Sequence, residues 1–468
     1  MTISRRKLLV AAGATVTAGA AGVGLRVRSL DAEPPAPPLR GPEDRLLWRN
    51  WSGIESSYPA LRAGPATEDE VLAAVQSGPS PVRAVGAGHS FTGLVPTDGT
   101  LLSLDGLSGI IDHDPATLQA TVLAGSRLGE LGAALAAIGQ CMPNLPDINK
   151  QSLGGAIATG THGSGVHSPA LHAQVVSLRI ATPGLGFVDC SRTEHPEIFD
   201  AARVGLGAFG VVTRYRLQNV ASIRLLKRVE LRPTAEVLEE WPAIRARHRN
   251  AEFFALPFTG MSATVTHDVT ERAPEVRAAP QDSQVLLDLK WLRDWAGFSN
   301  TLRRRLAQSA MASMQPEESV EEAWKVLSNE RDIRFNEMEY HLPREAQIDA
   351  LREVLAAIEK YLPDVFFPIE VRSIAPDDAW LSPFHVRESG SLAVHAYYKD
   401  DYRPLFDLVE PILRRHGGRP HWGKLHSLSA HDFTGMYPRW KDALEVRRTL
   451  DPDGRLLNAH LRRLFQGG

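Results

Sequence analysis

Cysteine is scarce in this 468-residue sequence, which contains only Cys141 and Cys190. Two thiols cannot form a disulfide framework or a four-cysteine zinc site, although a single disulfide between them stays open. A charge excess is also lacking, because 52 lysines and arginines stand against 55 aspartates and glutamates, which gives a net charge of −3. The overall charge therefore does not indicate a nucleic-acid partner.

Strongly hydrophobic runs are rare as well, and the uncharged stretch from Leu8 to Leu25 consists mostly of Ala, Gly, Thr and Val. This composition is weak for a transmembrane helix. The stretch follows Arg5 and Arg6 in a segment that resembles a twin-arginine signal, and residues 18–20 offer a small-residue cleavage site. Residues 1–30 are therefore predicted to direct export to the periplasm or the extracellular space. An uncleaved membrane anchor and a chance arginine pair are the alternatives.

The rest of the composition, 43% hydrophobic and 23% charged, is that of a globular protein, and the length predicts two or three domains. A proline-rich linker over residues 31–45 precedes the folded body. Up to about residue 220 short strands and helices alternate with Gly-rich turns, and beyond it the helical segments are longer and more charged. No internal repeat is visible. The pattern predicts an α+β architecture with a boundary near residue 220.

Hydrophobic periodicity predicts the individual elements. Thr67 and Glu70 form a capping-box pattern ahead of the apolar stripe that contains Val71 and Val75. Helices are also expected over residues 128–138, 235–248 and 344–361, and strands over residues 81–85, 101–104, 118–123, 175–181, 211–217 and 369–372.

The first of three Gly-containing segments, residues 83–91, runs from a strand into a tight turn. Successive N–H groups in such a turn can form a nest that binds a pyrophosphate. A dinucleotide fingerprint with three glycines fails here, because Phe91 occupies the third Gly position, so a Rossmann NAD site is disfavoured. A plain hairpin turn with an incidental histidine explains the spacing equally well. The candidate ligand-binding residues are Gly86, Ala87, Gly88, His89 and Ser90.

The second segment, residues 151–165, interleaves five glycines with small and hydroxyl side chains, which leaves a thin wall for a flat ligand. His162, His167 and His172 are spaced five apart and share no helix or strand face, so no metal site is expected. The third segment, residues 205–213, is a Gly-rich turn that enters a strand. The candidate residues of these two segments are Gly154, Gly155, Thr159, Gly160, His162, Gly163, Ser164, Gly165, Gly210, Val211 and Val212.

In this order, the three segments resemble the flavoproteins of the vanillyl-alcohol oxidase type. The resemblance implies an FAD-binding fold of two subdomains over residues 46–220, a separate α+β substrate cap domain over residues 221–430, and a segment over residues 431–468 that returns to the FAD domain. In that family the turn histidine often carries the flavin covalently through its 8α-methyl group, and His89 matches this position. Cys141 does not match the second tether of doubly linked relatives. FAD bound through His89 is therefore expected.

The resemblance narrows to the aldonolactone oxidases and the related alditol oxidases because of three short segments, residues 335–340, 370–372 and 420–424. In a strand, Glu370 and Arg372 point to the same face, where a carboxylate and a guanidinium can bind a row of sugar hydroxyls. A cross-strand ion pair is the plainer interpretation. Glu337 and Glu339 alternate in the same way, but the sequence indicates a binding role for them less strongly than for Glu370 and Arg372. Glu339 is expected to be structural.

Lys424, set between Trp422 and His426, is expected to be a partly desolvated base or a cation near the flavin, although an isolated lysine is usually solvated. By resemblance, His421 is placed with the cofactor and Ser152 beside the flavin and the reacting hydroxyl. The candidate catalytic residues are Glu370, Arg372, Lys424 and Ser152.

These residues predict an exported FAD-dependent oxidoreductase that moves hydride from a sugar-derived CH–OH group to the flavin. The expected substrate is an aldonolactone such as gulono- or arabinono-1,4-lactone, with molecular oxygen as acceptor and hydrogen peroxide as product. An alditol oxidase, a dehydrogenase with another acceptor, and a non-catalytic flavin- or sugar-binding protein are the alternatives. No nucleic-acid partner is expected, and no stable membrane partner unless the signal is uncleaved.

Overall fold

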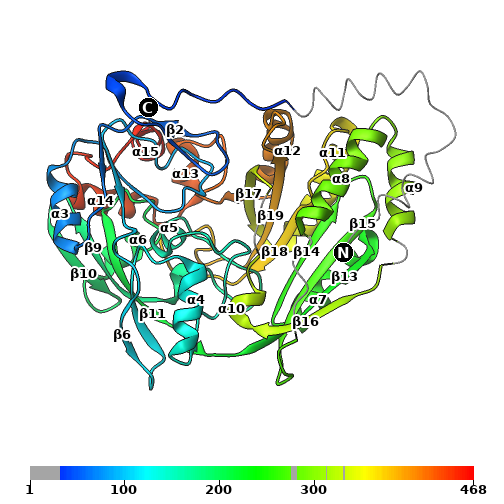
Figure 1. The fold of residues 1–468 in the computed structure, drawn as a ribbon, viewed down its shortest axis with the longest axis horizontal. Helices are drawn as coiled ribbons and strands as arrows, with labels where there is room; N and C mark the ends of the chain where they lie inside the picture. Colours follow the sequence, from blue (N-terminus) through cyan, green and yellow to red (C-terminus); the bar gives the residue numbers. More distant parts are fainter. Residues whose placement is uncertain (1–31, 276–281, 312–313, 330–332, 468) are drawn as a thin grey trace.

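The computed structural model describes residues 32–275, 282–311, 314–329 and 333–467. The predicted export signal lies outside the described residues. The chain forms two halves that lie side by side, one built from residues up to about 220 and the other around a single large sheet (Figure 1). The last helices return to the first half, and no helix among the described residues is long and apolar enough to cross a membrane.

The first half contains a parallel sheet, in the order β3-β5-β4, and an antiparallel sheet, in the order β10-β9-β11-β7-β6. The strands of the two sheets are β3 (Leu61–Ala63), β4 (Val82–Val85), β5 (Thr100–Ser103), β6 (Ile110–Asp114), β7 (Gln119–Leu123), β9 (Val175–Thr182), β10 (Gly186–Ser191) and β11 (Val211–Gln218). Two short pairs join β1 (Trp48–Arg49) to β2 (Ser56–Ser57) and β8 (Gln140–Cys141) to β12 (Val220–Ala221). The helices are α3 (Glu68–Ser77), α4 (Leu128–Ala137), α5 (Leu153–Ala158) and α6 (Pro196–Ala202), with 3-10 turns at Pro42–Asp44 and Leu171–Gln174.

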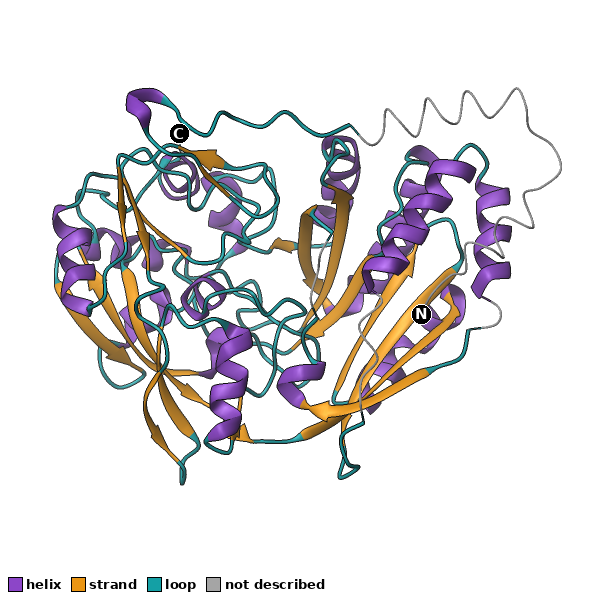
Figure 2. Cartoon of the chain, in the orientation of Figure 1, coloured by secondary structure: helices purple, strands orange, loops and turns teal. Residues whose placement is uncertain are grey.

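The second half is built on an antiparallel sheet in the order β16-β13-β15-β14-β18-β19-β17-β20, with helices along it (Figure 2). Its strands are β13 (Arg224–Pro233), β14 (Asn250–Leu256), β15 (Met261–Val269), β16 (Glu317–Glu322), β17 (Phe335–Pro343), β18 (Ile369–Ile374), β19 (Ser389–Tyr397) and β20 (Arg419–Pro420). Its helices are α7 (Thr234–Arg247), α8 (Asp282–Ala296), α9 (Asn300–Met311), α10 (Ala323–Val326), α11 (Gln347–Tyr361) and α12 (Arg403–Arg415), with a 3-10 turn at Arg344–Ala346.

Residue alternation divides the centre of this sheet into an apolar face and a polar face. Met338, Val371 and Leu392 are fully or almost fully buried in the main core, which also contains apolar residues of α7, α11 and α12. The intervening residues, such as Glu370 and Arg372, point to the opposite face because successive strand side chains alternate. A row of ionisable groups therefore faces the first half of the molecule.

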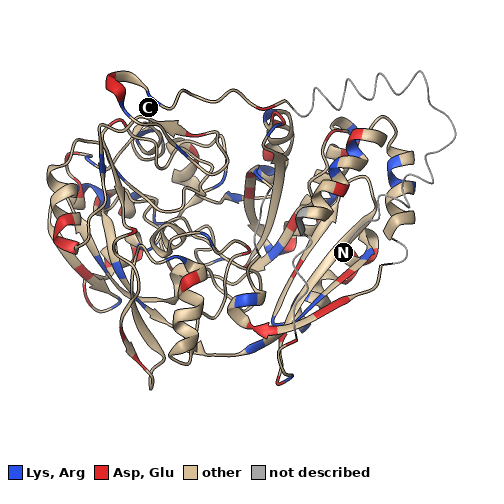
Figure 3. Ribbon diagram, in the orientation of Figure 1, with Lys and Arg blue, Asp and Glu red and all other residues tan. Residues whose placement is uncertain are grey.

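The C-terminal helices α13 (Ala430–Met436), α14 (Trp440–Leu450) and α15 (Ala459–Phe465) pack against the first half. Backbone N–H of Val82 donates to the Arg455 carbonyl at 2.9 Å, and the Asn458 side chain donates to the Gly93 and Pro96 carbonyls, each at 2.8 Å. Positively and negatively charged residues are interspersed along the chain in both halves (Figure 3).

The predicted elements are present with boundary shifts of one or a few residues, except that the helix expected over residues 344–361 begins as a 3-10 turn. The capping box at Thr67 is only half formed. Its hydroxyl accepts from the Glu70 N–H at 3.2 Å, whereas the Glu70 carboxylate accepts from the Ala66 N–H. The open question of a disulfide is also answered, because Cys141 and Cys190 are both free and buried, on strands β8 and β10 of different sheets.

Candidate active site

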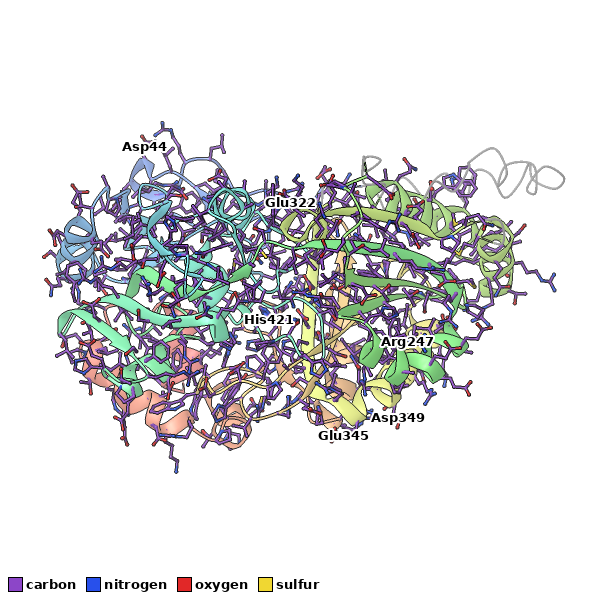
Figure 4. The ribbon with its side chains drawn as sticks, turned by 90° about the horizontal axis from the view of Figure 1, so that it is seen from below. Asp44, Arg247, Glu322, Glu345, Asp349 and His421 are labelled. Atoms are coloured by element: carbon purple, nitrogen blue, oxygen red, sulfur yellow. The ribbon has the colours of Figure 1, made fainter. Side chains whose placement is uncertain are left out.

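A large cavity lies between the two halves, and all three Gly-containing segments and the polar face of the large sheet line it. His421, which is labelled in Figure 4, lies where the two halves meet and also lines the cavity. One end of the cavity is walled by backbone and small side chains, and the other by ionisable groups. The segments that the sequence separates by more than 300 residues are therefore brought together in one site.

The first Gly segment forms a turn that follows strand β4 and lines the cavity through Gly86, Ala87, Gly88, His89 and Ser90. Gly88 has a φ of 69°, in the left-handed region that favours glycine. A Cβ on Gly86 would collide with the Ser152 hydroxyl, so the close approach of the first two segments requires glycine there.

The imidazole of His89 stacks on Trp51, with ring centroids 5.1 Å apart. Burial, with smaller contributions from Lys424 and Arg127, lowers the pKa of His89 to about 4. The ring is therefore neutral at physiological pH, and one of its nitrogens carries a free lone pair.

The second segment folds into the short helix α5, whose N-cap is Ser152; the Ser152 hydroxyl accepts from the Gly155 N–H at 3.4 Å. Ser152, Gly154, Gly155, Thr159 and His162 line the cavity. The first turn of this helix thus presents backbone and small side chains toward the cavity.

Four candidates of the second segment do not line the large cavity, namely Gly160, Gly163, Ser164 and Gly165. The Ser164 hydroxyl donates to the Ala251 carbonyl on β14, and the Gly165 N–H donates to the Ser373 carbonyl on β18 at 2.7 Å. The chain after His162 is therefore bonded to the large sheet, because its hydrogen-bonding groups pair with strands that local sequence does not reveal.

The third segment lines the cavity through Gly210, Val211 and Val212. Gly210 has a φ of 153°, and a Cβ there would press into Ile180. Arg83 carries no local sequence signal as a site residue, but it is buried and donates to the Leu94, Leu206, Gly207 and Leu456 carbonyls at 2.7–2.8 Å. This side chain ties the first and third segments to the C-terminal region, and no local pattern could have revealed its partners.

Two ion pairs form the polar end of the cavity. Lys424 pairs with Glu337, and an Nη of Arg372 lies 2.5 Å from a carboxylate oxygen of Glu339. Arg372 Nε lies 3.5 Å from Glu370 Oε1, but neither atom has a well-formed hydrogen bond among the described residues. A donor and an acceptor with unfilled hydrogen-bonding capacity thus stand side by side, as a hydroxyl-rich ligand requires.

Histidines surround the same carboxylates. His162 Nε2 lies 3.1 Å from Glu339 Oε1, and His395 Nε2 lies 3.6 Å from Glu337 Oε1. The His421 ring is placed by its own turn, because its Nδ1 accepts the Gly423 N–H at 3.0 Å. Burial lowers the pKa of His421 to about 3, so its imidazole is neutral at pH 7.

Burial and ion pairing divide the carboxyl groups into two classes. Burial alone would raise the pKa of Glu337, but Lys424 and His395 bring it down to about 2. Burial is likewise outweighed at Glu339, where Arg372 and His162 hold the pKa well below its usual value. The pKa of Glu370 is raised by burial, against the opposing effect of Arg372. Glu337 and Glu339 are therefore carboxylates at neutral pH.

Glu339, which the sequence predicts to be structural, lines the cavity and pairs with Arg372. Phe335, Glu337 and Glu339 occupy alternate positions of β17 and share its cavity face, which is the same alternation that singled out Glu370 and Arg372. The signal for these residues was therefore present, but their partners on β18 and after β20 were not visible in the sequence. His395 and Asp147, which also line the cavity, carried no local signal.

Two groups of side chains come close enough to hold a metal ion among the described residues: His162 with Glu339 and His341, and Glu337 with Glu370 and His395. In each group a carboxylate already contacts a cation, Arg372 in the first and Lys424 in the second. These positive charges oppose the binding of a divalent ion.

The cavity fits FAD in both of its parts. Glycines that tolerate no Cβ form the wall beside the turn at residues 86–90, where backbone N–H groups can approach a pyrophosphate. The remaining lining includes the ion pairs, where unfilled donors and acceptors suit a polar substrate.

Comparison with known proteins agrees with this arrangement. A family model described as an FAD binding domain matches residues 59–191, and one described as D-arabinono-1,4-lactone oxidase matches residues 215–464. The L-gulono-1,4-lactone dehydrogenase of Mycobacterium tuberculosis is 35% identical over 90% of this chain and 99% of its own length. The alditol oxidase of a Streptomyces species is 31% identical over 89% and 99%, and the L-gulonolactone oxidase of Mus musculus is 29% identical over 90% and 98%.

Among solved structures, cholesterol oxidase from Brevibacterium sterolicum superposes with a TM-score of 0.73 at 16% identity, covering 93% of this chain and all of that one. This likeness confirms the expected fold, an FAD-binding half beside a separate α+β half. The family resemblance of the sequence motifs is confirmed as well. The chain therefore belongs to the D-arabinono-1,4-lactone oxidase family.

Proposed function

We propose that this protein oxidises a CH–OH group of an aldonolactone with FAD as its cofactor. The observation that carries the proposal is the position of Glu370 and Arg372 opposite the Gly-lined wall, with hydrogen-bonding atoms unfilled in a buried setting. Full-length relatives whose names give gulonolactone as substrate support the same substrate class. An alditol is the second candidate, because the Streptomyces alditol oxidase is 31% identical.

The side chains divide the work of binding and proton transfer. Arg372 donates to substrate oxygens while Glu339 holds the guanidinium in place, and Glu370 accepts from substrate hydroxyls. The carboxylate form of Glu370 can take the hydroxyl proton. The Nδ1 lone pair of the neutral His421 ring already accepts the Gly423 N–H, so its protonated Nε2 is left as a donor to the substrate. Lys424, paired with Glu337, supplies positive charge at the same end. Bound FAD supplies the hydride acceptor.

Anaerobic mixing of the purified protein with a panel of aldonolactones and alditols tests this function, with flavin absorbance as the readout. Bleaching by a lactone identifies the substrate class, and bleaching only by alditols favours the second candidate. Admission of air then tests our proposal that oxygen is the acceptor, through recovery of the absorbance together with hydrogen peroxide. A flavin that no member of the panel bleaches would contradict catalysis and leave a binding protein.

We further propose that His89 carries the FAD covalently. Its neutral ring lies in the cavity turn, held against Trp51. The purified protein should remain yellow after acid precipitation, because a covalent bond survives the loss of the fold. His89→Ala should release all of its flavin under the same treatment. His167→Ala is the matched control, because His167 is exposed and does not line the cavity. Complete release of FAD from the wild-type protein would contradict the covalent link.

Export through the folded-protein route is a separate proposal, motivated by Arg5 and Arg6 ahead of a weakly hydrophobic stretch. A protein that takes up FAD before it crosses the membrane requires such a route. The double substitution Arg5→Lys and Arg6→Lys should retain the protein in the cytoplasm, as measured by fractionation and immunoblotting. Arg26→Lys, beyond the uncharged stretch, should have no effect. Normal export of the double variant would overturn this route.

A further inference from the structure

A second, smaller cavity lies behind Arg372, and the mechanism above makes no use of it. Arg372 and Asp147 line both cavities, so they lie between the large cavity and this small one. Asp147, Glu252 and His267 contribute ionisable groups to the wall of the small cavity. The guanidinium that is proposed to bind the substrate therefore has carboxyl groups on two sides.

The sheet register places Glu252 directly beside Arg372. Glu252 on β14 is the antiparallel partner of Arg372 on β18, so the two side chains leave the same face of the sheet. Directly paired residues have Cβ atoms about 5 Å apart, which is within reach for a glutamate and an arginine. On β18 itself, Glu370 lies two residues away on that face. Glu252, Glu339 and Glu370 thus surround one guanidinium.

A single guanidinium cannot neutralise three carboxylates at once. Glu339 makes the close ion pair with Arg372, and Glu370 Oε1 lies 3.5 Å from Arg372 Nε. When Glu252 is ionised, it therefore competes with both carboxylates for the guanidinium. Removing a charge from water without a full partner costs several kcal/mol, and a carboxyl group avoids that cost by keeping its proton.

We propose that Glu252 is a positioning residue for Arg372, and that its neutral form leaves the guanidinium to Glu339, Glu370 and the substrate. The ionised form draws Arg372 toward the small cavity and weakens substrate binding. This inference rests on the proposed oxidation of an aldonolactone or alditol at the large cavity.

The electrostatic surroundings of Glu252 place the loss of its proton at a pH that can be reached in an experiment. Burial, with smaller contributions from Glu370 and Asp147, raises the pKa of Glu252 to about 8 against the opposing effects of Arg372 and Lys227. His267 is the other ionisable group that lines the small cavity. Because the raised pKa keeps the proton on Glu252 below about pH 8, substrate affinity should fall as the pH rises through this value.

The test is anaerobic stopped-flow reduction of the flavin at a series of pH values, with L-gulono-1,4-lactone or xylitol as the probe. The lactone is stored in weak acid and mixed into each buffer, so that it does not hydrolyse. In the wild type, the apparent substrate dissociation constant should rise above pH 8, approaching about tenfold per pH unit, because one proton is lost. The limiting reduction rate should change by less than about twofold.

Glu252→Gln should remove this rise, because the amide keeps the shape of the neutral acid but cannot ionise. Glu236→Gln, a matched change at an exposed position on α7, should retain it. A rise that persists in Glu252→Gln, or a flat profile in the wild type, would overturn the role of Glu252 while leaving the proposed function intact. A flavin that neither probe reduces at any pH would overturn both together.

Discussion

Lys424→Ala is expected to give a folded, flavin-containing protein whose flavin is reduced by substrate at least about a hundredfold more slowly than in the wild type. A charge or a positioned acid or base that acts on the transition state typically contributes this much. Only 19% of the Lys424 side chain is exposed, it lines the cavity and it pairs with Glu337, so it is not a solvated surface lysine. A surface lysine would change the rate very little.

A second substitution in the Lys424–Glu337 ion pair can show whether Lys424 acts on the substrate or only neutralises Glu337. Removal of Lys424 leaves the Glu337 carboxylate buried without its main partner, and this alone can disturb the site. The double variant Lys424→Ala and Glu337→Gln removes that stranded charge. If Lys424 acts on the substrate, the double variant should remain as slow as the single one. Recovery of near wild-type reduction would assign Lys424 a purely structural role, and the measurement in each case is the anaerobic reduction rate across substrate concentration.

Arg372→Ala is the second change with a large expected effect, and it should act on binding. A hydrogen bond to a charged group contributes about 1.5–3 kcal/mol, which corresponds to a loss of affinity of about tenfold to a hundredfold. Arg372→Lys should not restore the affinity, because a single ammonium cannot reproduce a planar fork that serves Glu339 and two adjacent hydroxyls at once.

The readout for Arg372 is the substrate dissociation constant from flavin bleaching, together with flavin content and the thermal unfolding midpoint. Because Arg372 is buried between two carboxylates, both variants should also lower the unfolding midpoint. Arg352→Ala, an exposed position on α11, is the control for removal of an arginine as such. An unchanged dissociation constant in Arg372→Ala would remove this residue from substrate binding.

The sequence by itself determined those features that depend on neighbours along the chain. Glycine at positions 86 and 88 indicated a tight turn, and the structure shows positive φ at Gly88 and a contact at Gly86 that no side chain permits. The alternation of Glu370 and Arg372 placed both on one face of a strand, because side-chain direction in a strand has a period of two. The order of the three Gly-containing segments indicated the family, and the comparisons confirm it.

Only the tertiary structure decided how these local features combine. The partners Lys424 and Glu337 are 87 residues apart, and Arg372 meets Glu339 across two strand pairings, so neither ion pair has a local signature. Ser164 and Gly165 belonged by composition to the Gly-lined wall, but the Ser164 hydroxyl and the Gly165 N–H donate to carbonyls of β14 and β18. Long-range pairing also set Glu252 beside Arg372. The physical reason is that strand register and burial, which fix charge partners and pKa values, arise from contacts between distant segments and not from local periodicity.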